Sequence, residues 1–95
     1  MDLTKIEERR ALIEPLMEAI VSTGDAHEAA WRAFDAAVLR FKRQYEPDRA
    51  SLLVGLTEAA QAVVDTEAAK NAAFATYQAG MDKLRAAKQE SEVVL

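Results

Sequence analysis

The sequence predicts an all-α protein, and three observations support that fold class. Among its 95 residues 20 are Ala, whereas three are Gly and two are Pro. Ala has the highest intrinsic helix propensity, and Gly and Pro have the lowest. Apolar residues recur at spacings of three and four, which is the period of a helix face. β-branched residues nowhere alternate with polar ones, so no strand is predicted.

Start and stop signals divide the chain into three predicted amphipathic helices. Thr4 and Glu7 have the spacing of a capping box, which begins the first helix, and Asp25 is placed to cap the second. Pro47 ends the second helix, and the third follows directly. These signals place the helices at about residues 5–21, 26–45 and 49–90. Residues 1–95 are predicted to form a single domain with a frayed tail at 91–95.

Three residues interrupt these predicted helices. Pro15 removes a hydrogen bond and crowds the preceding turn, so a kink or a break is expected there. Gly55 and Gly80 each cost about 1 kcal/mol relative to Ala inside the third helix. That helix is nevertheless predicted to be continuous, because Met81 and Leu84 keep the apolar stripe in phase beyond Gly80.

Each predicted helix carries an apolar stripe that should face a partner helix. In the first helix the stripe is Leu3, Ile6, Arg10, Ile13, Met17 and Ile20. In the second it is His27, Trp31, Phe34, Val38, Phe41 and Tyr45. In the third it is Leu53, Leu56, Ala60, Val63, Glu67, Lys70, Phe74, Tyr77, Met81, Leu84 and Lys88. Leu12, Leu16, Leu39 and Leu52 widen these stripes.

Two arrangements of the helices are compatible with their lengths. At 1.5 Å per residue the third helix is roughly 63 Å long, and neither other helix exceeds about 30 Å. In a three-helix bundle, part of the third stripe stays bare and forms a candidate interface of Phe74, Tyr77, Met81 and Leu84. In a long antiparallel hairpin, the first two helices lie end to end along the third. We favour the hairpin. In it, the numbers of opposed residues sum to roughly 94, and the polar gap at Glu67 and Lys70 faces the Ser22–His27 junction. Because the hairpin is only two helices thick, a flat apolar face remains and self-association is expected.

Composition restricts the classes of function. The net charge is −4 and the pI is about 5.0, whereas nucleic-acid binders carry a basic face. The chain has no Cys, no secretory leader in its first ten residues and no apolar run of the roughly 18 residues that a membrane helix needs. A cytoplasmic protein with no membrane role is expected, and short Ala-rich chains without Cys are typical of bacteria and their phages.

The sequence offers few residues for chemistry. His27 is the single histidine, and no glycine-rich phosphate loop or metal-binding motif is present. We therefore expect no catalytic residues, no metal site and no cofactor, and we interpret His27 as a partly buried side chain beside Trp31. One local basic patch, a candidate anion site, comprises Arg40, Lys42, Arg43 and Arg49. Cations at a helix C-terminus also complement the helix dipole, which is the simpler interpretation.

The leading hypothesis is a non-enzymatic module for protein–protein interaction: an adaptor, an inhibitor or a small assembly subunit that forms homo-oligomers through its apolar stripes. A first alternative is a small ligand-binding or catalytic protein for an anionic metabolite, using Arg10, Lys70 and His27. A second alternative is nucleic-acid binding through the basic patch at 40–49, although the acidic net charge argues against it.

Overall fold

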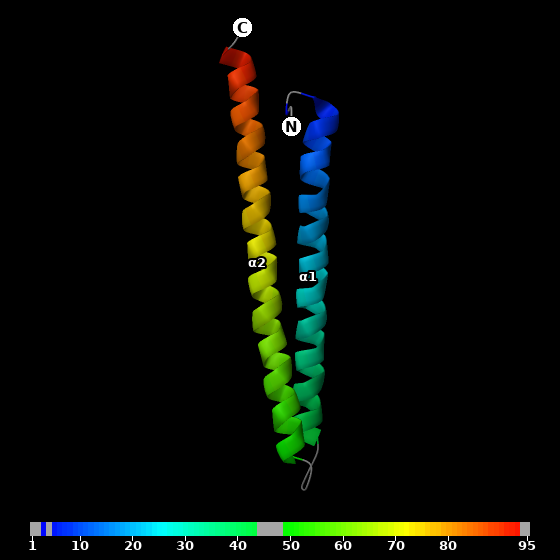
Figure 1. Cartoon of the computed structure of the whole chain (residues 1–95). Helices are drawn as coiled ribbons and strands as arrows, with labels where there is room; N and C mark the ends of the chain where they lie inside the picture. Colours follow the sequence, from blue (N-terminus) through cyan, green and yellow to red (C-terminus); the bar gives the residue numbers. More distant parts are fainter. Residues whose placement is uncertain (1–2, 4, 44–48, 94–95) are drawn as a thin grey trace. The chain divides into compact units, whose positions relative to one another are not determined.

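The computed structural model describes Leu3, residues 5–43 and residues 49–93, and throughout these ranges the chain is all-α. Helix α1 spans Ile6–Arg43 and helix α2 spans Arg49–Val93 (Figure 1). The predicted fold class is therefore confirmed. The capping residue Thr4 and the predicted helix-ending residues between 44 and 48 lie outside the described residues.

The first two predicted helices are one continuous helix. The predicted break at Ser22-Thr23-Gly24 is wrong, because α1 runs through all three residues. Gly costs only about 1 kcal/mol relative to Ala inside a helix, and most helical stability in proteins comes from packing an apolar face. Thr23 and His27 keep that packed face in register across the predicted break, since both are half-buried.

Pro15 also lies inside α1 and does not end it, so a break at this position is wrong. A proline leaves the carbonyl oxygen four residues earlier without its usual hydrogen-bond donor. That carbonyl belongs to Ala11, and both Ala11 and Pro15 are exposed. Water can therefore satisfy the carbonyl, which keeps the cost of the proline low enough for the helix to continue.

Helix α2 matches the third predicted helix. It begins at Arg49 and is continuous through Gly55 and Gly80, as the stripe beyond Gly80 indicated. It ends at Val93, three residues later than predicted, so residues 91–93 belong to the helix. Residues 94–95 of the predicted frayed tail lie outside the described residues.

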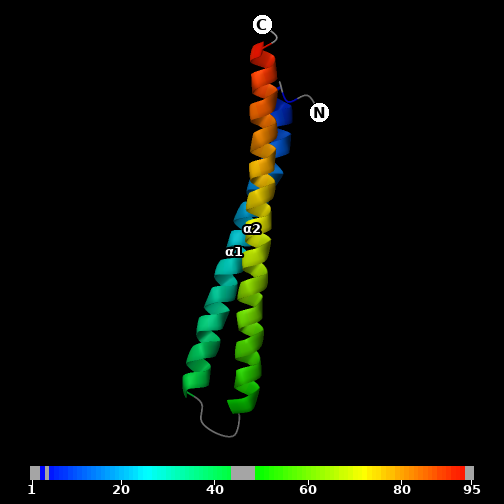
Figure 2. The same ribbon diagram turned by 90° about the vertical axis from the view of Figure 1, so that its left-hand side faces the viewer.

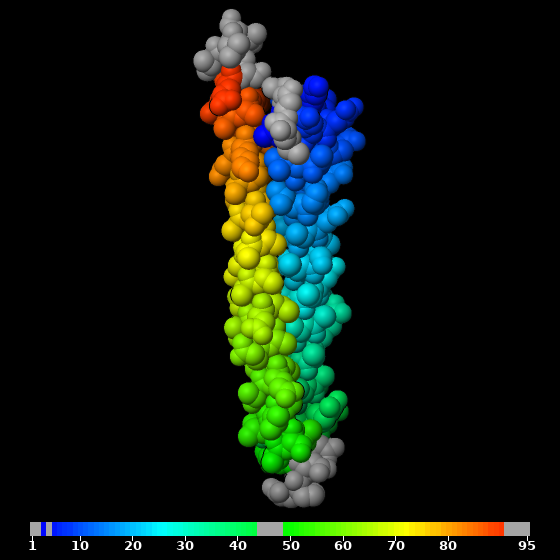
Figure 3. Space-filling view, in the orientation of Figure 1, coloured from blue at the N-terminus to red at the C-terminus, as the bar shows by residue number. Residues whose placement is uncertain are grey.

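The chain packs as two compact units, and both helices contribute to each. The terminal unit comprises Met1–Ser22 and Asn71–Leu95, and the central unit comprises Thr23–Lys70. Within each unit the segment of α1 lies antiparallel to the segment of α2 (Figures 1 and 2). Atoms of the two segments meet in each unit in the space-filling view (Figure 3). The antiparallel hairpin pairing is confirmed, and the single domain at 1–95 stays a prediction.

The central unit has a narrow seam between its two helix segments. Ala30 and Val63 are the buried hydrophobic residues of the described chain. Half-buried residues extend the seam along both helices; they are His27, Phe34, Ala37 and Phe41 of α1 and Leu52, Leu56, Ala59 and Thr66 of α2. The predicted stripe placed Trp31 on this seam, but its side chain is 47% exposed. A small alanine, Ala30, takes the inward position instead.

The seam of the terminal unit agrees with the predicted stripes at some positions and differs from them at others. Its half-buried residues are Leu12, Ile13, Leu16 and Ile20 of α1 and Ala73, Tyr77, Met81, Leu84 and Ala87 of α2. Gly80 is buried among them, and a Cβ added there would lie 2.6 Å from Cδ1 of Leu16. The predicted inward residues Ile6, Arg10, Met17, Phe74 and Lys88 are exposed. The seam includes Ile13, Ile20, Tyr77, Met81 and Leu84, as the stripes predicted, and the small Gly80 between them allows the close approach of Leu16 to α2.

Within each unit, the numbers of opposed residues sum to within two of the predicted value of about 94. His27 meets Thr66 in the central unit, and Gly80 meets Leu16 and Ile13 in the terminal unit. Glu67 and Lys70, predicted to face an irregular junction, are exposed. Since α1 is helical at that level, it has no irregular backbone for those side chains to satisfy.

Candidate interaction surface

The seams leave many large apolar side chains uncovered. Among the described residues nine large apolar side chains are exposed, while two hydrophobic residues are buried. In the terminal unit the exposed ones are Ile6, Met17, Val21 and Phe74. In the central unit they are Trp31, Leu39, Leu53, Val54 and Val64. Single exposed apolar residues are ordinary, but groups of them on one face mark interaction sites.

The exposed residues of the central unit gather partly around Trp31. The side chains of Trp31, Phe34, Ala60 and Val63 line an apolar cleft of about 170 Å³ that is open to solvent. Trp31 and Phe34 stand edge to face, with ring centroids 5.8 Å apart and planes at 86°. Such pairs contribute about 0.5–1.5 kcal/mol beyond their buried area, so the indole is held in one orientation.

Helical spacing extends this cleft into a larger face. Val38 lies seven residues after Trp31 on α1, and on α2 Leu53 and Val64 lie seven residues before and four after Ala60. Residues four and seven apart share one side of a helix. We call the resulting surface of the central unit the Trp31 face; its residues are Trp31, Phe34, Val38, Leu53, Ala60, Val63 and Val64.

A hydrogen-bond chain fixes the inner edge of the Trp31 face. The Trp31 Nε1–H donates to Nε2 of His27 over 3.2 Å, and Nδ1 of His27 lies 3.0 Å from Oγ1 of Thr66. In a neutral imidazole with Nε2 as acceptor, Nδ1 carries the proton and donates to Thr66. The Thr66 hydroxyl in turn donates to the carbonyl oxygen of Ala62 over 2.7 Å. His27 is thus half-buried beside Trp31, as predicted, but it lies in the middle of α1 rather than at the start of a second helix, and it links the two helices.

The sequence-predicted interface residues all belong to the terminal unit. Phe74 is 53% exposed, whereas Tyr77, Met81 and Leu84 are half-buried on its seam. Phe74 and Tyr77 are neighbours on α2, with ring centroids 6.5 Å apart. The structure therefore separates the predicted interface into one exposed aromatic ring and three seam residues. The role of these four residues as an interface stays a prediction.

The four residues of the basic patch are exposed in the central unit. Arg40, Lys42 and Arg43 occupy the last turn of α1, where they complement the helix dipole. The Arg49 guanidinium lies 4.6 Å from the centroid of the Phe41 ring, a cation–π contact. Arg40 also borders a groove of about 420 Å³ whose other walls are mostly small side chains, among them Ala33, Ala37 and Gly55.

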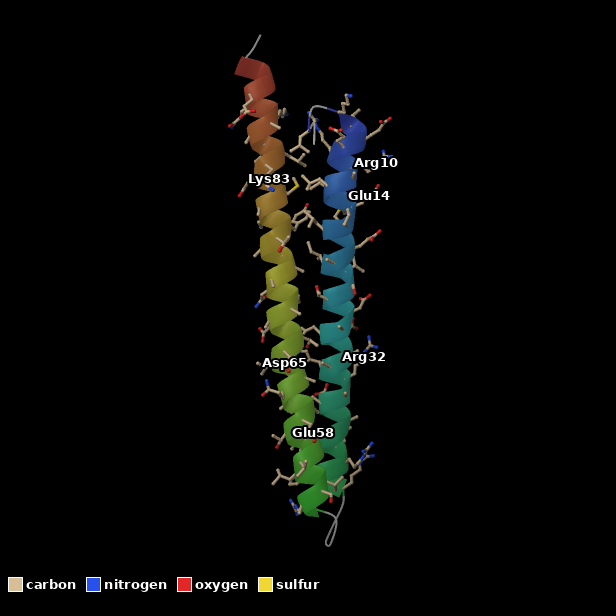
Figure 4. The ribbon with its side chains drawn as sticks, in the orientation of Figure 1. Arg10, Glu14, Arg32, Glu58, Asp65 and Lys83 are labelled. Carbon is tan, nitrogen blue, oxygen red and sulfur yellow. The ribbon has the colours of Figure 1, made fainter. Side chains whose placement is uncertain are left out.

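The residues proposed for an anionic metabolite are not assembled within one unit. Arg10 belongs to the terminal unit and is exposed, with its Nε 3.6 Å from Oε1 of Glu14, on the side of α1 turned away from α2 (Figure 4). Lys70 and His27 belong to the central unit, where Lys70 is exposed and His27 bonds to Thr66 and Trp31. No observation on these residues favours anion binding over surface ion pairing.

The described ranges contain neither a metal-binding cluster nor a membrane-spanning helix. Residues 3, 5–43 and 49–93 contain no group of three or more acidic, histidine or cysteine side chains arranged to hold a metal ion. Neither helix in those ranges has a stretch sufficiently long and apolar to span a membrane.

The predicted stripes contain most of the seam residues but not Ala30, Thr66 or Gly80. Each of these three lies one position before a predicted stripe residue. The available signal was the recurrence of small residues at helical spacing, which permits close helix packing. No family model, no curated protein and no solved structure matches this chain.

Proposed function

We propose that this protein is a non-enzymatic helical interaction module of the cytoplasm that associates with copies of itself and serves a protein partner as an adaptor, inhibitor or small assembly subunit. One observation carries the proposal: nine large apolar side chains are exposed among the described residues, and only two hydrophobic residues are buried. Covering such side chains contributes about 25 cal/mol for each Å² of apolar area removed from water. Association is the direct way to gain that free energy.

The central unit supplies the most specific support. Its Trp31 face combines an aromatic ring held by two contacts with aliphatic side chains from both helices. Interfaces are enriched in Trp, and an anchor already fixed in one rotamer loses little conformational entropy on binding. A face of this composition suits a second apolar helix surface better than a polar ligand.

Sedimentation of the full chain from nanomolar to high micromolar concentration tests the proposal. We expect a mass at least twice the monomer's 10.5 kDa at the upper end, decreasing on dilution. A single 10.5 kDa species at every concentration would contradict self-association.

A thermal-shift series with anionic metabolites tests the enzyme and ligand alternative in the same preparations. The proposal predicts no specific shift. A shift that disappears in both Arg10→Ala and Lys70→Ala would instead support metabolite binding. Retention on DNA or RNA that decreases steeply with salt would support the nucleic-acid alternative.

A further inference from the structure

The Trp31 face has the size of a helix-pair interface. Its described helix segments, 23–43 and 49–70, are each about 32 Å long at 1.5 Å per residue, and two adjacent helices are roughly 20 Å wide. The face therefore covers about 600 Å² in projection. A standard interface buries about 800 Å² of accessible surface per partner. One copy of this face against another is thus of the order that a stable dimer requires.

Charge is distributed unevenly along this face. At one end lie Lys42, four residues after Val38, and Arg49, four residues before Leu53. At the other end lie Glu28, three residues before Trp31, and Glu67, four residues after Val63. Helical spacing puts each of these charges on the same side of its helix as its apolar neighbour. All four are exposed, and Glu28 is ion-paired with Arg32 of its own helix. The face is therefore basic at one end and acidic at the other, and between these ends its apolar side chains are interrupted by Asp35.

This order of charges is self-complementary about one two-fold axis. Midway between Lys42 and Glu28 on α1 is position 35, and midway between Arg49 and Glu67 on α2 is position 58. The register of His27 with Thr66 places positions 35 and 58 at the same level of the central unit. Consider a two-fold axis at that level that is perpendicular to both helices and parallel to the face. It places the basic end of each copy opposite the acidic end of the other copy, as an isologous dimer requires.

We propose that a second copy of this chain docks on the Trp31 face in an antiparallel orientation, so that each helix of the central unit lies on its own counterpart. The inference rests on the proposed self-association and names its surface and symmetry. In this dimer Lys42 opposes the partner's Glu28, and Arg49 opposes the partner's Glu67. Trp31 comes within one residue of the level of the partner's Val38, so apolar side chains fill the middle. A two-fold axis parallel to the helices would instead set basic end against basic end.

This symmetry brings one pair of like charges together, and that pair provides a test of the position of the axis. Asp35 lies four residues after Trp31, on the same side of α1, and at the level of the axis. The two copies therefore bring their Asp35 carboxylates together, where like charges repel. Asp35→Asn should tighten the dimer several-fold, whereas the same change at Asp65, on the other helix and away from the axis, should leave it unaltered.

Charge reversal tests the proposal by sedimentation equilibrium on the full chain. Lys42→Glu/Arg49→Glu should raise the dissociation constant at least tenfold, because four opposed pairs become repulsive. Lys83→Glu/Lys88→Glu makes the same change in net charge in the terminal unit and is the matched control. Mixing Lys42→Glu/Arg49→Glu with Glu28→Lys/Glu67→Lys should restore association as a heterodimer.

A neighbouring pair of apolar residues tests the face itself. Leu53 and Val54 are 52% and 59% exposed, but only Leu53 belongs to the Trp31 face, since Val54 is turned by 100° around α2. Leu53→Ala should weaken the dimer about tenfold and Val54→Ala should change it less than twofold. Circular dichroism of each variant establishes that the helices persist.

The outcomes separate this inference from the broader proposal. If the parent chain is monomeric, self-association and the dimer both fail. Suppose instead that the parent chain dimerises, that Lys42→Glu/Arg49→Glu behaves like the terminal-unit control, and that Leu53→Ala behaves like Val54→Ala. The Trp31-face dimer is then overturned, while self-association stands. A higher dissociation constant for the Asp35→Asn dimer would likewise overturn the proposed axis.

Discussion

The two units of this protein join the same two helices by different means. In the terminal unit a buried glycine, Gly80, lies against the side chains of Leu16 and Ile13, so the helices are matched by shape. In the central unit Ala30 and Val63 are buried beside a polar link between His27 and Thr66. Both means oppose sliding of one helix along the other, because Gly80 is flanked on its seam by the larger Tyr77 and Leu84 and because a hydrogen bond joins defined atoms. The register therefore depends on shape in the terminal unit and also on a polar link in the central unit.

The largest expected effect concerns the glycine of the terminal unit. Gly80→Leu should lower the free energy of unfolding by about 1–3 kcal/mol, because the added atoms overlap the space that Leu16 occupies. Urea unfolding at a fixed chain concentration measures the change. Gly24→Leu is the matched control: nothing lies within 4 Å of its added Cβ, so it should stabilise the helix by up to about 1 kcal/mol. Equal effects of the two changes would remove the distinction that we draw at Gly80.

A smaller effect is expected at the polar link of the central unit. Thr66→Val should cost about 1 kcal/mol, because it leaves Nδ1 of the half-buried His27 without its partner. Thr57→Val is the control, since the exposed Thr57 hydroxyl bonds only to the Leu53 carbonyl of its own helix. A double-mutant cycle of Thr66→Val with His27→Ala should yield a coupling of about 0.5–1 kcal/mol. A coupling near zero would show that the link does not define the register.

The smallest effects are expected at surface ion pairs. Asp82→Asn should cost up to about 0.5 kcal/mol, because Arg85 lies three residues later in the favourable acid-before-base order at 2.9 Å. Glu14→Gln should cost less, because its partner Arg10 precedes it and the distance is 3.6 Å. Both pairs belong to the terminal unit, so thermal unfolding of the two variants compares two ion pairs within the same unit. A loss above 1 kcal/mol at either site would mean that surface charges, rather than the seams, govern this unit.

Composition and periodicity determined the fold class, the extent of α2 to within three residues and the antiparallel register to within two. These follow from intrinsic helix propensity and from apolar spacing, which are properties of short segments. The sequence also predicted that apolar surface would remain uncovered, because a hairpin only two helices thick leaves a flat apolar face, and nine large apolar side chains are exposed among the described residues.

Tertiary packing decided which residues occupy the seams. The Ser22-Thr23-Gly24 signal and Pro15 both indicate helix ends locally, yet α1 continues, because packing of its apolar face outweighs a cost of a few kcal/mol. Likewise the predicted stripes placed Trp31 and Phe74 on the packed faces, yet both are about half exposed. Small residues beside them let the helix axes approach closely, and that gain depends on the partner helix, which no single segment of sequence specifies.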